Sequence, residues 1–252
     1  MKQIFLISLM LALCIVVPAQ TPVSPKATRL VLMDFRLDRN TPPLKIPAAT
    51  RKMVLSKLFR RYLTDESKCN RNVEGTGTDP LKAARDAGQA VPDVVDMATG
   101  SFTAPGQTQT LYVVSVNECN ASHAENFGTK RVAIFAGQQL VANVDVDFKN
   151  TILKKTDLNG DGIDELLMSA GDMHQGVVDE VAGLLEFPNG RLRVIQDLGP
   201  VVEDACPSEA PGSTSTAAVV SFLTGVPGKM PKLRVENYEK KCTKGARWRL
   251  VK

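Results

Sequence analysis

The sequence has few of the residues and motifs that carry catalysis. It contains two histidines, His123 and His174, in 252 residues. It has no His-Glu-x-x-His, Gly-x-Ser-x-Gly or Gly-x-Gly-x-x-Gly motif and no P-loop. Nothing therefore predicts a zinc protease, an α/β-hydrolase or a nucleotide-binding fold. Cys-x-x-Cys is also absent, which argues against a zinc site or a redox motif.

A secreted hydrolase is an alternative function, and two sets of residues suggest it. Ser122, His123 and Asp172 supply the residue types of a nucleophile, a base and an acid, although no motif supports the set. Pairs of carboxylates hydrolyse glycosidic bonds, and Asp145 and Asp147 alternate on one predicted strand and so share a face. A structural component of the cell envelope is a second alternative.

Residues 1–19 are predicted to form a secretory signal peptide. Lys2 supplies the positive charge, Ile4–Val17 the apolar core and Val17-Pro-Ala19 the residues before cleavage. The apolar run is too short to be a convincing membrane span. We therefore expect a secreted or periplasmic protein that begins near Gln20 and has no stable membrane span after cleavage.

Four cysteines follow the predicted signal, which fits an oxidising compartment. Four cysteines allow three pairings. Order along the chain favours Cys69 with Cys119 and Cys206 with Cys242, because each bridge then closes a loop of moderate length.

The excess of positive charge is small. Without Lys2 the chain has 30 basic and 27 acidic residues. The basic residues form mild clusters at Lys57–Arg61 and Lys240–Arg249 and are otherwise spread along the chain. This pattern indicates solvated surfaces, and we expect no nucleic-acid partner.

Two regions are expected after the signal. Residues 20–91 form a small N-terminal α/β part, with a strand at 30–35 and helices at 46–63 and 79–87. Residues 92–252 alternate short apolar runs with Gly, Asn and Asp turns, which is typical of antiparallel β-structure. Strands are predicted in three sets, at 94–103, 110–118, 130–136 and 139–147, then 151–156, 165–170, 179–187 and 191–198, then 201–206, 216–223, 232–238 and 247–252.

The strongest chemical motif is Asp157-Leu-Asn-Gly-Asp-Gly-Ile-Asp-Glu165. A hard cation such as Ca²⁺ takes six to eight oxygen ligands. The three acidic residues among the candidate ligands, Asp157, Asp161 and Glu165, repel one another unless a cation is present. The loop offers most of the required oxygens through the side chains of Asp157, Asn159, Asp161 and Glu165 and the backbone carbonyl of Ile163.

The motif differs from an EF-hand loop. An EF-hand requires a bidentate Glu at position 12, where this chain has Met168 inside an apolar run. The pattern Asp-x-Asn-Gly-Asp-Gly-x-x-Glu followed by Leu-Leu instead resembles the calcium loop of FG-GAP/VCBS repeats, over about 11 residues. The resemblance implies a loop that joins two strands of a β-propeller blade and holds a structural Ca²⁺ on Asp157, Asn159, Asp161, Ile163 and Glu165.

Two features depart from that family. It usually has Asp where Glu165 stands, and its propellers need more blades than this chain supplies. Three units cannot close a typical ring of four to eight blades. We therefore predict a mostly-β fold of propeller-like antiparallel repeats that is not a complete closed propeller, with the strand at 30–35 completing it.

A second copy of the loop lies 56 residues earlier. Aligning Ser101–Leu111 with Asp157–Leu167 places Gly106 on Gly162. The ligand positions then become Ser101, Thr103, Pro105 and Gln109, so no carboxylate remains, and we expect this degenerate copy to bind no metal or to bind it poorly. A further 56 residues leads to Ser213–Thr216, where the glycine is also lost.

Together these features predict a calcium-stabilised, disulfide-containing β-repeat protein outside the cytoplasm. The favoured function is a binding or adhesion module for a protein or glycan partner that the sequence does not identify.

Overall fold

The structure is a computed structural model that describes residues 28–39, 44–69, 87–119, 129–147, 149–208, 210–224 and 228–251. The predicted signal peptide at 1–19, nearly all of the predicted helix at 79–87, and Ser122 and His123 lie outside the described residues.

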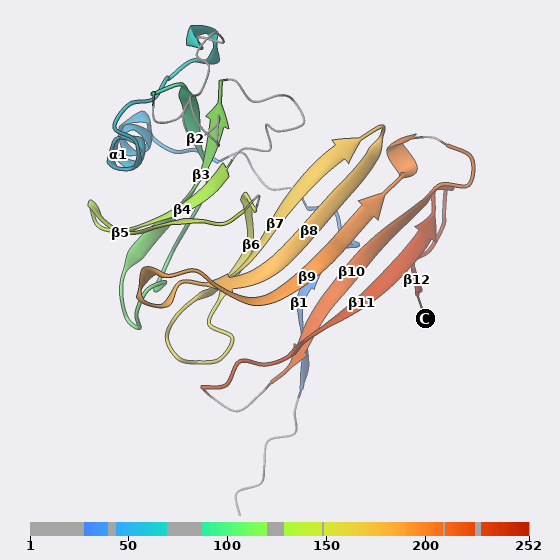
Figure 1. The fold of residues 1–252 in the computed structure, drawn as a ribbon. Helices are drawn as coiled ribbons and strands as arrows, with labels where there is room; N and C mark the ends of the chain where they lie inside the picture. Colours follow the sequence, from blue (N-terminus) through green and yellow to red (C-terminus); the bar gives the residue numbers. More distant parts are fainter. Residues whose placement is uncertain are drawn as a thin grey trace, which may run out of the picture.

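The described chain is mostly β-structure with one short α-helix near its N-terminus (Figure 1). The strands and the α-helix are β1 (Arg29–Asp34), α1 (Ala48–Leu58), β2 (Ala90–Gly100), β3 (Gln109–Glu118), β4 (Thr129–Ala136), β5 (Gln139–Asp145), β6 (Thr151–Thr156), β7 (Glu165–His174), β8 (Val177–Glu186), β9 (Arg193–Asp204), β10 (Thr214–Leu223), β11 (Leu233–Lys241) and β12 (Arg249–Leu250). Short 3₁₀ turns lie at Glu66–Lys68, Pro188–Gly190 and Cys206–Ser208.

Two antiparallel sheets organise the molecule. β2, β3, β4 and β5 form a four-stranded meander, and β6 to β12 follow one another in a larger curled sheet (Figure 1). The first predicted set of strands matches the small sheet. The second and third sets share the large sheet, and the described strands do not close into a ring.

β1 joins the large sheet through β10. One edge of β10 pairs with β9 over Ser215–Ala217 and then with β1 over Val219–Leu223. The predicted strand at 30–35 therefore does add to the C-terminal strands. The predicted N-terminal part contributes β1 to the large sheet and α1 to the small one.

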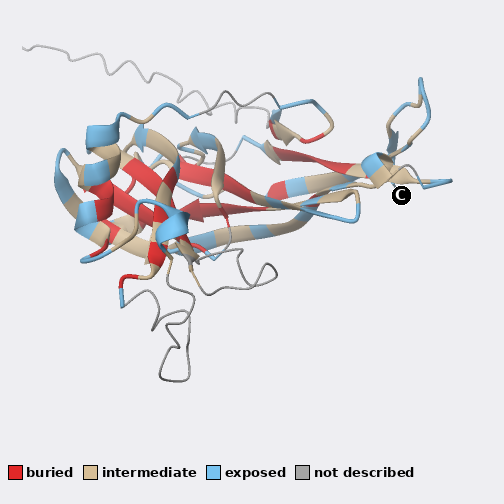
Figure 2. Ribbon diagram, turned by 90° about the horizontal axis from the view of Figure 1, so that it is seen from above, coloured by how far each residue is buried: buried red, intermediate tan, exposed pale blue. Residues whose placement is uncertain are grey.

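Alternation along β7 connects the two sheets. Leu166 and Met168 point to the four-stranded sheet and pack with Leu111 of β3 and with Phe102 of the β2–β3 loop. Leu167 points to the opposite face and joins a second core with β1. An apolar run that is buried on both faces is typical of an internal strand. Figure 2 shows that buried residues concentrate where the sheets overlap.

Helix α1 covers the outer face of the four-stranded sheet. Val54 and Leu55 pack there against Val114 and Phe135. The helix is shorter than the predicted 46–63, because Phe59 adopts an extended conformation that leaves its ring in the same core. Among the described residues, no helix is long and apolar enough to cross a bilayer.

One predicted break in the strands is wrong. The strands expected at 191–198 and 201–206 are a single strand, β9. Gly199 and Pro200 suggested a turn, but they sit in a stretch where the β8–β9 register shifts three times. Bulges absorb these residues without ending the strand.

Two disulfides cross-link segments of the described chain. Cys69 bonds to Cys119 and Cys206 to Cys242, with Cα atoms 5.4 and 5.1 Å apart. This is the pairing that order along the chain favours. The first bridge ties the segment after α1 to the end of β3, and the second ties the segments that follow β9 and β11. Cross-links of this kind stabilise mainly by restricting the unfolded chain.

Candidate functional site

Residues Asp157–Glu165, here called the acidic loop, connect β6 to β7 in a hairpin. The Asp157 carboxylate organises the turn. Its Oδ1 accepts hydrogen bonds from the amides of Gly160 at 2.7 Å and Asp161 at 3.2 Å, and its Oδ2 accepts one from Gly162 at 2.9 Å. Gly162 has φ +86°, a left-handed conformation that is strained for a residue with a side chain.

Asn159 and Asp161 continue the same pattern. Asn159 Oδ1 accepts from the Asp161 amide, and Asp161 Oδ1 accepts from the Ile163 amide, both at 2.8 Å. The Asn159 side-chain amide donates to Asp161 Oδ2 at 2.9 Å. Short polar side chains that bind backbone amides two residues on fix a tight turn. The predicted ligand side chains are thus drawn toward the interior of the loop.

Glu165 is the least satisfied group of the acidic loop. It is fully buried, and its Oε2 accepts a hydrogen bond from the Leu158 amide at 2.6 Å. Its Oε1 is buried and has no hydrogen-bond partner among the described residues. Desolvation, reinforced by the charges of Asp161 and Asp157, raises the pKa of Glu165 to about 7. A buried carboxylate without a full set of partners is costly.

The loop brings three carboxylates together. Oxygen atoms of Asp157, Asp161 and Glu165 all lie within 4.8 Å of one another. A carboxylate oxygen that accepts one amide keeps a second lone pair. Together with the unpartnered Oε1 of Glu165, this donor set fits a hard divalent cation such as Ca²⁺.

Residues Ser101–Gln109, here called the neutral loop, make the same hairpin between β2 and β3. Gln109 stands where Glu165 stands in the acidic loop, and it is also buried. Its Oε1 accepts from the amides of Phe102 at 2.9 Å and Thr103 at 3.0 Å, and its Nε2 donates to Thr103 Oγ1 at 2.6 Å. The uncharged side chain of Gln109 thus satisfies the backbone amides of Phe102 and Thr103 without a cation.

The two loops touch each other. The Asp164 amide donates to the Ser101 carbonyl at 2.7 Å, and the Ser101 amide donates to Asp164 Oδ2 at 2.8 Å. A Cβ added to Gly162 would lie 2.9 Å from Cβ of Pro105. The acidic loop therefore sits at the seam between the two sheets.

Two further contacts strengthen the seam. The Asp96 carboxylate of β2 accepts the Ile152 amide of β6 at 2.6 Å, and burial raises the pKa of Asp96. Gly228, in the β10–β11 connection, donates its amide to the Asn159 carbonyl at 2.6 Å. The segment at Ser213–Thr216, where the repeat alignment places a third loop, instead begins β10.

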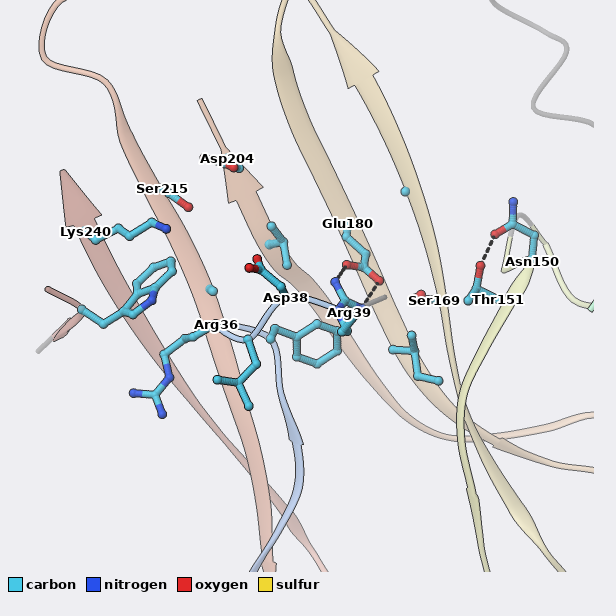
Figure 3. Close-up of a pocket in the computed structure, with 17 residues that line it drawn as sticks. Arg36, Asp38, Arg39, Asn150, Thr151, Ser169, Glu180, Asp204, Ser215 and Lys240 are labelled. Carbon is cyan, nitrogen blue, oxygen red and sulfur yellow. Dashed lines mark hydrogen bonds and ion pairs between the residues drawn. The ribbon is translucent and has the colours of Figure 1, made fainter. Parts of the chain in front are cut away.

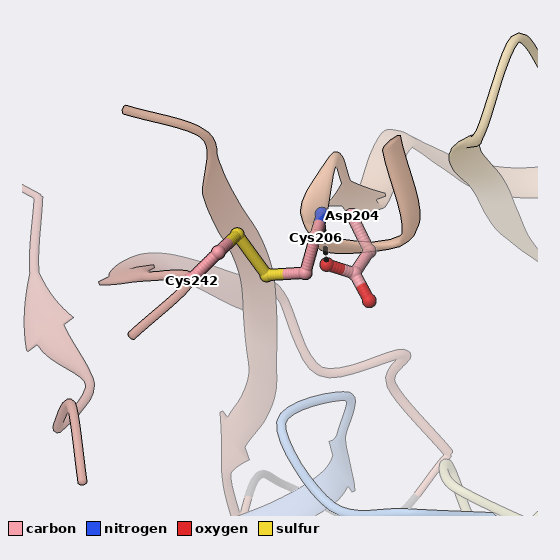
Figure 4. A group of neighbouring side chains, drawn as sticks. All are labelled: Asp204, Cys206 and Cys242. Carbon is pink, nitrogen blue, oxygen red and sulfur yellow. Dashed lines mark hydrogen bonds between the residues drawn. A yellow bond between two sulfur atoms is a disulfide. The ribbon is translucent and has the colours of Figure 1, made fainter. Parts of the chain in front are cut away.

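A second group of potential metal ligands is Asp204, Cys206 and Cys242 (Figure 4). Both sulfurs are in the disulfide, so neither is available as the thiolate that binds metals. Asp204 Oδ1 accepts the Cys206 amide at 3.1 Å. This group is therefore a capped turn next to a disulfide.

A polar groove of about 520 Å³ lies on the face of the large sheet that carries β1. The segment Phe35–Arg39, which follows β1, forms one part of its lining. Figure 3 shows Lys240, Ser215 and Asp204 on one side, Asn150, Thr151 and Ser169 on the other, and Asp38, Arg39 and Glu180 between them. Residues separated by about 200 positions meet here, so no local motif could reveal the groove.

The candidate catalytic residues do not form a described site. His174 Nε2 contacts the Asp172 carboxylate, but the His174 side chain is 72% exposed near the end of β7. Asp145 ends β5, and Asp147 has φ +53°, so the predicted strand face that they would share does not extend to Asp147. Asp145 instead pairs with Arg131 at 3.2 Å.

Comparison with protein-family models, with curated proteins and with solved structures finds no match for this chain.

Proposed function

We propose that this protein is a binding module of the cell exterior or periplasm, held together by a structural Ca²⁺ in the acidic loop. The observation that carries the proposal is the convergence of Asp157, Asp161 and Glu165 around a buried carboxylate oxygen that has no partner among the residues the structure describes. Asn159 and the Ile163 carbonyl complete the proposed ligand set.

The position of the loop supports a structural role. Bound Ca²⁺ would neutralise three neighbouring carboxylates, and the loop that holds it contacts both the neutral loop and the β10–β11 connection. Stabilising the acidic loop would therefore stabilise the contact between the two sheets. The two disulfides support a site of action in an oxidising compartment.

The groove supports the binding part of the proposal. It lies away from the loops at the seam, and a cavity of about 520 Å³ falls in the size range of ligand sites. The structural ion and the binding surface are then separate, and a change in one need not abolish the other.

Thermal unfolding of residues 20–252 with Ca²⁺ and with a chelator tests the calcium site. Ligand at a hundredfold excess over its Kd stabilises the folded state by about 2.7 kcal/mol. In a chain of this size this raises the Tm by about 5–10 °C. Asp161→Ala should lose this rise. Asp197→Ala is the matched control, because the Asp197 carboxylate also accepts the amide two residues on, but at a bulge within β9 and outside the acidic loop. An equal Tm with Ca²⁺ and with chelator would overturn the proposal.

A further inference from the structure

The charges that line the groove balance. Three basic side chains, Arg36, Arg39 and Lys240, face three acidic ones, Asp38, Glu180 and Asp204. Each basic group also has an internal partner. Arg39 pairs with Glu180, Arg36 pairs with Asp34 outside the lining at 2.7 Å, and Lys240 lies over the Trp248 ring at 4.6 Å. The groove therefore holds no excess charge of either sign.

Several polar groups in the groove keep hydrogen-bonding capacity. Ser169 and Ser215 are only 2% and 3% exposed, yet both line the cavity. Within the described part of the chain, neither hydroxyl makes a hydrogen bond, and the exposed Asp38 carboxylate makes none either. The two hydroxyl oxygens are not among the described polar atoms that are sealed from solvent without a partner, so they open onto the groove. A hydroxyl that faces a groove is available both to donate to an occupant and to accept from it.

From these features we infer that the groove binds a neutral, hydroxyl-rich ligand, namely a short uncharged oligosaccharide. The inference rests on the proposed binding function and names its ligand. Hydroxyl pairs on a sugar donate and accept at neighbouring positions. Asp204, Ser215 and the Arg39–Glu180 pair offer matching acceptors and donors.

Other ligand classes fit less well. A phosphate or nucleic acid requires an excess of basic groups, and an apolar ligand requires a mainly apolar lining. Peptides are captured along open strand edges or in apolar grooves, whereas this lining consists largely of polar side chains on the face of the sheet.

The second disulfide holds in place one wall of the groove, which is formed by Lys240, Ser215 and Asp204. Cys206 donates its amide to Asp204, and Cys242 lies two residues after Lys240. The bridge between the two cysteines therefore fixes both ends of this wall before a ligand arrives. Such preorganisation lowers the entropy that binding must offset.

The test is titration calorimetry of the full mature chain in 1 mM Ca²⁺. The probes are neutral tri- and tetrasaccharides of glucose, mannose, galactose and N-acetylglucosamine. Sulfated and uronate-containing oligosaccharides and uncharged hexapeptides form the comparison panel. At least one neutral saccharide should bind, and Asp204→Ala and Ser215→Ala should each weaken its binding about tenfold. Glu203→Gln, on the opposite face of β9, should leave the affinity unchanged.

The outcomes separate this inference from the calcium proposal. Tm values with Ca²⁺ and with chelator are measured for every variant. If one of the two groove variants, Asp204→Ala and Ser215→Ala, fails to fold, the other variant alone tests the inference. If no neutral saccharide binds while the Ca²⁺-dependent rise in Tm is present, the ligand inference is overturned and the calcium site stands. Binding only to charged saccharides or to peptides overturns it as well. Saccharide binding without any Ca²⁺ effect supports the groove and overturns the calcium site.

Discussion

The acidic and neutral loops build one turn with opposite chemistry. Each connects two antiparallel strands, and the register that closes the hairpin is the same, with Gly100 opposite Gln109 and Thr156 opposite Glu165. In each, the last side chain accepts the amide of the second residue, at 2.9 Å for Gln109 and 2.6 Å for Glu165. The turn itself therefore does not require a cation.

The difference lies in how the buried end of the loop is satisfied. Gln109 uses its oxygen and its nitrogen, with three hydrogen bonds inside the neutral loop. Glu165 uses one oxygen and leaves the other without a partner in the described part of the chain, beside two further carboxylates. The neutral loop is complete as it stands, whereas the acidic loop is complete only with a cation, as we propose.

The largest expected difference between the loops appears when each buried side chain is replaced by leucine without Ca²⁺. Gln109→Leu removes the acceptor of two amides, and each unsatisfied buried group costs about 1–3 kcal/mol. We expect a loss of about 3–5 kcal/mol. Glu165→Leu leaves only the Leu158 amide without an acceptor and removes a buried charge, so we expect a loss of stability of less than about 2 kcal/mol. Urea unfolding in chelator measures both, and equal losses would contradict the comparison.

A second difference concerns pH. The folded-state pKa of Glu165, about 7, lies above its ordinary value of 4.5, so the folded state binds this proton more tightly than the unfolded state. The stability from this proton is complete below about pH 4.5 and is lost as pH rises toward 7. Without Ca²⁺ the loss is on the order of 3 kcal/mol.

The variant Glu165→Gln isolates this effect. The difference in unfolding free energy between wild type and variant should change with pH in chelator and become nearly flat in saturating Ca²⁺. A difference that is flat in chelator would contradict the burial of an unpartnered carboxylate. The Asp96 contribution cancels, because both proteins retain that residue.

A smaller effect distinguishes the two aligned glycines. Gly106 has φ +71° with nothing within 4 Å of an added Cβ, whereas Gly162 has φ +86° and faces Pro105. Left-handed strain alone costs about 1–2 kcal/mol. We expect Gly106→Ala to lose about 1 kcal/mol and Gly162→Ala about 2 kcal/mol, because only the second also disturbs the contact between the loops. Thermal unfolding measures both, and a larger loss at Gly106 would argue against that contact.

Local patterns predicted most of the fold. Alternating apolar residues and turn residues placed nearly all strands within a few positions, because period-two burial and the backbone needs of turns are local properties. The break predicted near Gly199 failed because bulges accommodate such residues inside β9. Helix α1 ended early because tertiary packing placed Phe59 in the core.

The site was predictable only in part. Spacing alone pointed to Asp157, Asn159, Asp161 and Glu165, because their chemistry is contiguous in sequence. The burial of Glu165 depends on the packing between the sheets, and the seam contacts come from Ser101, Pro105 and Gly228. The groove combines residues from 35 to 248, so sequence spacing carries no signal for it.

Direct calcium titration by calorimetry tests the central comparison most directly. Wild-type protein should bind one Ca²⁺ per chain, and Asp161→Ala and Glu165→Gln should each remove that binding. Gln109→Leu should leave it intact, since the neutral loop supplies no carboxylate. Absence of binding to the wild type, or binding that survives both acidic-loop variants, would contradict the account.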